Sequence, residues 1–176
     1  ATLAPYVARG VKIVGLEPSC LFTFKDEFLA MGLGAQADAL SEHAMLFEEF
    51  IAAEHKAGRF KPDFKPVATT ALLHGHCHQK AFDAMGAVEA ALRLVPGLTV
   101  KTIESSCCGM AGAFGYEAAH YDVSMKMAEM SLLPAVRAAS TDTILVADGT
   151  SCRHQIHDGA GREAIHVARV LERALP

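Results

Sequence analysis

Four short apolar runs divide the chain and predict buried β-strands. They begin at Val11, Thr70, Leu98 and Thr143, and read VKIVGLEP, TALLHGH, LTVKTIES and TILVADG. Each run is rich in β-branched residues or leucine and ends at Gly, Pro, Ser or His, as is typical of strands followed by turns. Longer segments with helical spacing lie between them. This alternation predicts an α/β fold: a mostly parallel sheet flanked by helices.

Helical periodicity is found in three segments, which cover residues 35–57, 79–95 and 116–138. In the first segment, the residues of one face recur at steps of three and four: Ala39, His43, Leu46 and Phe50. The stretch RFKPDFKP, residues 59–66, contains two prolines and predicts a surface loop.

Composition narrows the classes of protein. The 176 residues are 51% hydrophobic and 20% charged, as expected for one globular domain with a sizeable core. The net charge of −4 and the lack of a basic run argue against a nucleic-acid partner. No apolar stretch reaches the length of a transmembrane segment, and the N-terminus does not resemble a signal peptide. It also lacks a methionine and soon enters a strand-like run, so we expect a fragment of a longer chain.

The five cysteines are Cys20, Cys77, Cys107, Cys108 and Cys152. An odd number in a chain of this size does not fit a secreted disulfide framework and favours thiols or metal ligands in the cytosol. Each cysteine follows one of the predicted strands. Because ligands bind at the carboxyl ends of strands in open α/β sheets, the thiols are expected to meet at one edge.

The adjacent pair Cys107–Cys108 leaves several chemistries open. A disulfide between neighbours is strained, because their Cα atoms lie only about 3.8 Å apart. A single cysteine is often buried as a small apolar residue, but this does not explain why each of four strand ends is followed by a cysteine. A zinc site usually has C-x-x-C spacing, which is missing here, and a nucleophilic Cys77 would need a base that its sequence neighbours on a strand rarely provide.

An iron–sulfur cluster accounts for more of these features together. Adjacent thiolates can reach different irons, and Gly109 lets the backbone approach a cluster closely. A helix expected to begin near Gly115 or Tyr116 would direct its positive end toward an anionic group. His76 and His78 flank Cys77 and are candidates to lie near the cluster, or to be hydrogen-bonded turn residues, whereas His74 is expected to be an ordinary core or surface histidine.

Five blocks of the sequence resemble a known family. SCCGMAG, with HCH upstream and GTSC downstream, resembles the CCG cysteine-rich domain found in heterodisulfide reductases and in the iron–sulfur subunit of glycolate oxidase. The similarity is closer to the C-terminal part of proteins that fuse an FAD-linked oxidase to an iron–sulfur reductase. GLEPSC, HGHCHQKA, CCGMAGAFGYE, YDVSMK and VADGTSCRHQI all have counterparts there, so the resemblance covers nearly the whole chain.

The family unit holds two repeats, each with a lone cysteine, a CCG and a final C-x-x-C. IVGLEPSCLFTF and LVADGTSCRHQI also resemble each other within the chain. The resemblance therefore implies that residues 1–66 are the tail of a first repeat with connecting helices, and that residues 67–176 are a second repeat.

Carried over by position, the resemblance implies metal ligands at Cys77, Cys107, Cys108 and Cys152. The sequence departs from the pattern at Gln155, which stands where the last cysteine belongs. Cys20 matches the closing block of the preceding repeat, with Thr23 in the partner position, and is a candidate fifth ligand.

The family's function is electron transfer by a [4Fe-4S]-type cluster in an oxidoreductase. An FAD domain or subunit outside this segment would oxidise a 2-hydroxy acid such as glycolate, D-lactate or D-2-hydroxyglutarate, and a quinone or another carrier would accept the electrons. We expect no catalytic residue in this chain, which lacks a dinucleotide-binding fingerprint, and a cytoplasmic location, free or peripheral at the inner membrane face. A cluster-free docking domain and a zinc-stabilised fold are the alternatives.

Overall fold

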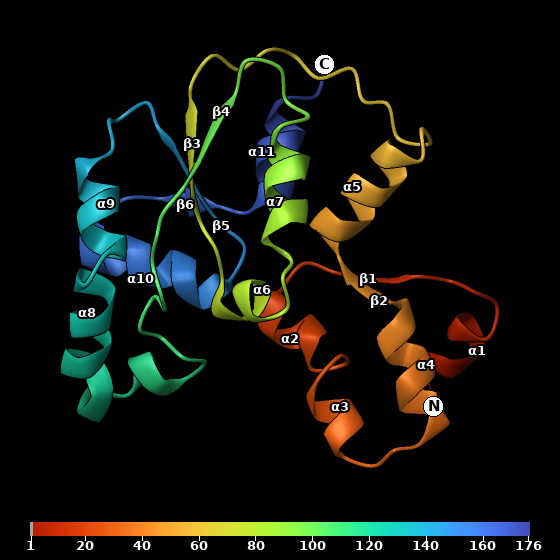
Figure 1. Cartoon of the computed structure of the whole chain (residues 1–176). Helices are drawn as coiled ribbons and strands as arrows, with labels where there is room; N and C mark the ends of the chain where they lie inside the picture. Colours follow the sequence, from red (N-terminus) through yellow and green to blue (C-terminus); the bar gives the residue numbers. More distant parts are fainter. Residues whose placement is uncertain (1) are drawn as a thin grey trace.

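The computed structural model describes residues 2–176 and confirms the α/β fold with helices flanking parallel strands (Figure 1). Four strands form the main sheet in the order β4-β3-β5-β6, and every neighbouring pair is parallel. These strands are β3 (Thr70–His74), β4 (Thr99–Thr102), β5 (Ile144–Ala147) and β6 (Ala164–Ile165). A second parallel pair joins β1 (Ile13–Gly15) to β2 (Ala44–Leu46). All four apolar runs therefore contain a strand, as predicted.

Eleven α-helices surround these strands in residues 2–176. They are α1 (Ala4–Val7), α2 (Pro18–Phe22), α3 (Glu27–Ala30), α4 (Ala35–His43), α5 (Phe47–Lys56), α6 (Cys77–Ala81), α7 (Met85–Leu92), α8 (Tyr121–Glu129), α9 (Leu132–Ala138), α10 (Thr150–Ala160) and α11 (Val167–Arg173). None of the helices in this range has the length and apolar character needed to cross a lipid bilayer. The segment between α5 and β3 has no helix or strand, which confirms the loop at 59–66.

The prediction of a single helix over residues 35–57 is wrong, because the helix is interrupted near its middle. Strand β2 separates α4 from α5, although its residues continue the helical stripe of the sequence. Ala44 and Leu46 are 1% and 0% exposed, and the strand pairs with β1 from Ile13 to Gly15. Pairing with a strand about 30 residues away thus outweighs the local helical pattern.

The other two helical segments are each divided as well. Between α6 and α7 the chain turns at Asp83, which has a positive φ of 55°. The start expected at Gly115 or Tyr116 is wrong for an α-helix: a 3-10 turn, η1 (Phe114–Tyr116), occupies it, and a second turn, η2 (Ala118–His120), follows. Glu117 between them is extended, so α8 begins only at Tyr121.

The main sheet separates two apolar cores. Helices α5, α7 and α11 cover one face, and α8, α9 and α10 lie on the other side (Figure 1). Alternation along the strands decides which side chain reaches which core. On β5, Val146 packs in the α5/α7/α11 core, whereas Leu145 and Ala147 pack in the α9/α10 core.

Candidate metal centre

Four of the five cysteines come together where β3, β4 and β5 end. Cys77 is the first residue of α6, Cys152 lies in the first turn of α10, and Cys107 and Cys108 lie in the loop after β4. The Sγ atoms of Cys152 and Cys108 are hydrogen-bonded at 3.4 Å, and the two side chains are buried. Cys77 and Cys107 are partly exposed. The group therefore has a buried side and a side open toward the surface.

Proton sharing among these thiols perturbs all four pKa values. Hydrogen bonding with Cys108 and Cys77 lowers the pKa of Cys107, and hydrogen bonding with Cys108 lowers the pKa of Cys152. Hydrogen bonding to Cys107, together with burial, raises the pKa of Cys77, and bonds with Cys107 and Cys152 raise that of Cys108. Cys107 and Cys152 are thus favoured as thiolates, the form that binds metals, while Cys77 and Cys108 retain their protons.

The loop that carries the adjacent pair is held by backbone contacts. Gly109 N donates to Cys107 Sγ at 3.3 Å. Gly109 has a φ of +93°, and a Cβ there would lie 2.1 Å from the carbonyl oxygen of Ser124. The glycine expected after the pair is thus required both by its left-handed backbone and by close contact with α8.

Gln155 anchors the same loop and has no free amide nitrogen. Its Nε2 donates to the carbonyl oxygen of Cys108 at 2.9 Å and to Ser124 Oγ at 3.0 Å, and the residue is 4% exposed. Gln155 therefore positions the backbone of the loop that carries Cys107 and Cys108.

Lys80 was not among the residues chosen from the sequence. Its Nζ donates to the carbonyl oxygens of Ser105 and, at 2.7 Å, Ser106, just before the cysteine pair. Burial lowers the pKa of Lys80, while the four thiols oppose this change. A cation beside the thiols offsets negative charge that would build up on them. Its position three residues after Cys77 was the feature of the sequence that could have indicated this role.

Two of the histidines expected near the thiols form a stacked pair. The His76 and His78 rings have centroids 5.2 Å apart and an interplanar angle of 23°. His76 Nδ1 accepts a hydrogen bond from His78 N at 3.2 Å, and burial lowers the pKa of His76. A Cβ built on Gly149 would lie 3.2 Å from both Cys152 Sγ and His76 Nε2, so the His76 ring lies beside the thiols.

Cys20 is not brought into this group. It is exposed on α2, and within residues 2–176 it makes no hydrogen bond with the four converging thiols. The neighbouring Phe22 instead packs against Phe82, with stacked rings 4.6 Å apart. Aromatic stacking thus contributes to the contact between α2 and the residue that follows α6.

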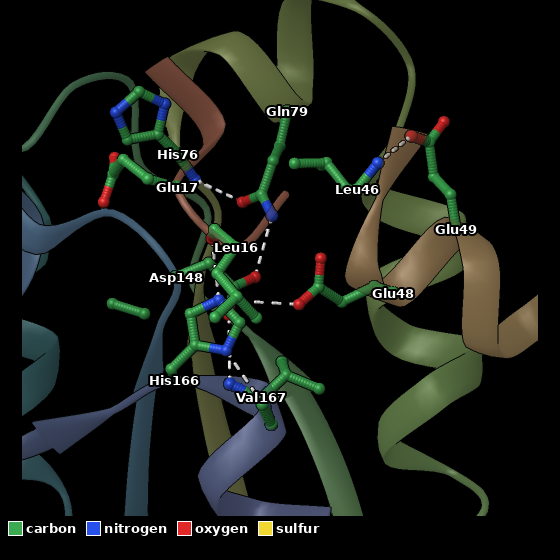
Figure 2. Close-up of polar contacts among 12 residues, drawn as sticks. Leu16, Glu17, Leu46, Glu48, Glu49, His76, Gln79, Asp148, His166 and Val167 are labelled. Carbon is green, nitrogen blue, oxygen red and sulfur yellow. Dashed lines mark hydrogen bonds and ion pairs between the residues drawn. The ribbon is translucent and has the colours of Figure 1, made fainter. Parts of the chain in front are cut away.

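A second polar group lies around Asp148, beside Glu48 of α5 and Val167 of α11 (Figure 2). Asp148 Oδ2 accepts from Gln79 Nε2 at 2.7 Å, and Asp148 Oδ1 accepts from Val167 N at 3.0 Å. His166 Nε2 lies 3.5 Å from Asp148 Oδ1 and 3.6 Å from Glu48 Oε1. Glu48 is 0% exposed and neither of its oxygens has a hydrogen-bond partner among the described residues. Sequence reasoning assigned no role to these residues.

The hydrogen bonds of His166 argue against a metal in this second group. Its Nδ1 accepts from Ala168 N at 3.0 Å, so the ring proton lies on Nε2, which points to the carbonyl oxygen of Leu16 at 2.9 Å. The nitrogen nearest the carboxylates therefore has no free lone pair. Burial, and then repulsion from Asp148, raises the pKa of Glu48 to about 9, so this carboxyl is protonated at neutral pH.

Glu17 links the N-terminal segment to the helix that carries Cys152. Its Oε2 accepts from Thr150 N and from Thr150 Oγ1, both at 2.8 Å. Burial alone would raise the pKa of Glu17, but these bonds and one from Ser19 lower it overall. Glu17 therefore provides the acceptor at the start of α10, where Gly149 has no side chain to do so.

Glu17→Gln is expected to lower the free energy of unfolding by about 1 kcal/mol at neutral pH, because a carboxylate accepts hydrogen bonds more strongly than an amide. A carboxyl with a lowered pKa stabilises the fold above its unfolded pKa and loses this effect as acid protonates it. The difference between the two proteins should thus shrink at acid pH. Urea denaturation at several pH values measures it, and a difference that stays constant would contradict this role.

The site's residues fit a thiolate-bound metal group. Four thiols converge with perturbed pKa values, and the buried His74 Nε2 beside them lacks a hydrogen-bond partner. Gly149 leaves space against Cys152 that a Cβ would fill, at 2.4 Å from the His76 ring. The chain thus belongs to the class of α/β domains with parallel strands, and the cysteine group at its strand ends offers sulfur donors to a metal group.

Sequence comparison relates the chain to one part of larger dehydrogenases. One subunit of the anaerobic glycerol-3-phosphate dehydrogenase of Escherichia coli (strain K12) is 25% identical over 167 residues, which are 95% of this chain and 41% of that protein. D-2-hydroxyglutarate dehydrogenases of Escherichia coli (strain K12) and Pseudomonas putida are 29% and 26% identical over 92% of this chain, but only 15% of each relative is covered. No family model and no solved structure matches the chain. The chain spans less than half the length of these relatives.

Proposed function

We propose that this chain is the iron–sulfur electron-transfer domain of a flavin-linked dehydrogenase, with Cys77, Cys107, Cys108 and Cys152 as thiolate ligands. The observation that carries this proposal is the convergence of four thiols from three strand ends, including an adjacent pair followed by a glycine in the left-handed region. A cluster bound by cysteines, of the [4Fe-4S] type by family resemblance, would accept and release single electrons. Cys20 is left outside this ligand set because of its exposed position on α2.

The chain's own residues would hold and shield such a group. The buried Cys108 and Cys152 keep water from one side, while the partly exposed Cys77 and Cys107 lie where a redox partner can approach. Lys80 and the amide of Gly109 favour negative charge on sulfur. No described residue is assigned a role in breaking a substrate bond.

The parent protein would supply the remaining parts of the reaction. The relatives' names support a dehydrogenase, whose FAD domain or subunit would pass electrons from a 2-hydroxy acid, or a comparable secondary alcohol such as glycerol-3-phosphate, to this domain. A quinone or another carrier would be the acceptor. The cytoplasm, or the inner face of the membrane, is the proposed location.

A repeated arrangement supports the proposed division at residue 66. The order strand, helix with a Ser-Cys pair, parallel strand and helix occurs in β5, α10, β6 and α11, and also in β1, α2, β2 and α5, where α3 and α4 are inserted between α2 and β2. Residues 1–66 would thus be the tail of a preceding repeat, and residues 67–176 a repeat with all four ligands. The preceding lone cysteine and CCG would lie upstream in the parent protein.

Anaerobic reconstitution of the 176-residue chain with Fe²⁺ and sulfide tests the proposal. We expect several iron atoms and inorganic sulfide per chain and an EPR signal on one-electron oxidation or reduction. Cys107→Ser should lose most of the bound iron, because this thiol contacts both Cys77 and Cys108. Cys20→Ser is the matched control and should load as the wild type does.

Two results would contradict the proposal in different ways. Tight binding of zinc with no uptake of sulfide would favour a zinc-stabilised fold. Absence of any bound metal, together with full activity of the parent dehydrogenase carrying Cys107→Ser, would favour a docking domain whose cysteines hold no cluster.

A further inference from the structure

His74 lies on the same side of the sheet as the thiols. It is the last residue of β3, and its neighbour Leu73 packs in the α5/α7/α11 core, whereas Leu72 packs in the α9/α10 core. Side chains alternate along a strand, so His74 shares the face of Leu72, where Cys108 and Cys152 are buried. Strand geometry thus directs this imidazole into the metal centre.

One nitrogen of the His74 ring is fixed and the other is free. Nδ1 lies 2.8 Å from Ser105 Oγ, whereas Nε2 is buried and has no hydrogen-bond partner of good geometry among the described residues; the ring lies close enough to Cys152 to lower the pKa of that thiol. The residue is 1% exposed. A ring nitrogen of His74 and the sulfurs of Cys108 and Cys152 all lie within 4.8 Å of one another. An unpartnered buried nitrogen is costly unless something else binds it.

The other two histidines near the thiols have different surroundings from His74. Because His76 Nδ1 accepts from a backbone amide, its proton lies on Nε2, which therefore cannot bind a metal. Within residues 2–176, His78 Nδ1 is also buried without a hydrogen-bond partner, but its ring stacks on His76 and approaches Phe22 of α2, and it is not grouped with the thiols as His74 is. Of the three histidines around Cys77, His74 thus has the hydrogen bonds typical of a metal ligand, whose second nitrogen usually donates to a fixed partner.

We propose that His74 Nε2 is a fifth protein ligand of the metal centre, in addition to the four thiolates; this inference rests on the proposed cluster. In this arrangement Nδ1 carries the proton and donates to Ser105 Oγ. Gln155 leaves the centre without the family's fifth thiolate, and its amide nitrogen is already bound to Cys108 O and Ser124. An imidazole in place of a thiolate leaves the bound group one negative charge less, which favours its reduced state.

Pulsed EPR on the reconstituted, paramagnetic protein tests the ligand directly. We expect a strong ¹⁴N hyperfine coupling that changes to a ¹⁵N coupling when the protein is made with ¹⁵N-histidine. His74→Ala should lose this coupling, while His76→Ala and His78→Ala should keep it. A coupling that survives in His74→Ala, or its absence from a wild-type chain that binds iron and sulfide, would overturn the inference.

If His74→Ala does not fold, as judged by circular dichroism, His76→Ala and His78→Ala still test whether His74 is the ligand. A histidine coupling present in both of them supports His74, and its loss in either one contradicts the assignment. Co²⁺ serves as a probe that needs no sulfide: a shifted, exchangeable Nδ1–H proton in the NMR spectrum is expected and should disappear in His74→Ala. If the chain shows this proton with Co²⁺ but takes up no sulfide, the proposed cluster is refuted, while His74 remains a metal ligand. If the Co²⁺-loaded chain does not show this proton, the assignment of His74 as a ligand is refuted.

Discussion

Gly109→Ala is expected to destabilise the folded chain by about 3 kcal/mol or more, combining backbone strain with overpacking. The added methyl group would lie 2.1 Å from the backbone oxygen of Ser124, which belongs to α8 and cannot rotate away as a side chain would. The φ of +93° adds strain for any residue with a Cβ. Urea denaturation followed by circular dichroism measures the loss.

Gly112→Ala is the matched control for this substitution. Gly112 lies in the same loop with a φ of +68°, but a Cβ there would meet no atom within 4 Å. Backbone strain alone should then cost about 1 kcal/mol. Equal losses in the two variants would show that contact with Ser124 does not determine the position of the CCG loop. Iron loading of Gly109→Ala should also fall below that of Gly112→Ala.

Glu48→Gln is expected to raise the free energy of unfolding by about 2 to 3 kcal/mol near pH 7. The folded-state pKa of Glu48 is raised to about 9, whereas the unfolded carboxyl ionises near 4.5. As the pH rises between these values, the unfolded chain releases a proton that the folded chain retains, so stability falls. Glutamine has the same shape and no proton to release, and its amide can donate to the neighbouring carboxylate of Asp148.

The sign of this effect is tested by its dependence on pH. The two proteins should differ little near pH 5, and the advantage of Glu48→Gln should grow toward pH 9. Glu42→Gln, an exposed position on α4, is the control and should be nearly neutral throughout. A constant or shrinking difference between pH 5 and pH 8 would contradict a protonated, buried Glu48.

The sequence was sufficient to locate four of the six strands in residues 2–176 and the thiols that follow them, because both depend on local patterns; β2 and β6 were not predicted. A buried strand is an apolar run, and a loop cysteine directly after it must lie at the sheet edge. Strand β2 was missed for the opposite reason. Leu46 fits a helical stripe with Ala39, His43 and Phe50 equally well, and pairing with β1 makes residues 44–46 a strand.

Roles that depend on distant partners could not be read from the sequence. HGHCHQK gives His74 and His76 nearly equivalent surroundings, yet Ser105, 31 residues away, fixes one ring and a local amide fixes the other. Cys20 follows a strand as Cys152 does, but its strand belongs to the smaller sheet. Asp148 becomes a buried acceptor only because α5 and α11 pack beside β5.

The hydrogen bonds between Glu17 and Thr150 affect how short a segment of this protein can be and still fold. All five proposed ligands lie between residues 74 and 152, so a shorter chain beginning at residue 67 would keep every one of them. It would nevertheless lose the acceptor at the start of α10 and the side chains that cover Asp148 and His166. The proposed ligands therefore span a shorter segment than the residues needed for the complete fold. Residues 1–66, which resemble the end of another repeat, supply contacts that complete the fold of residues 67–176.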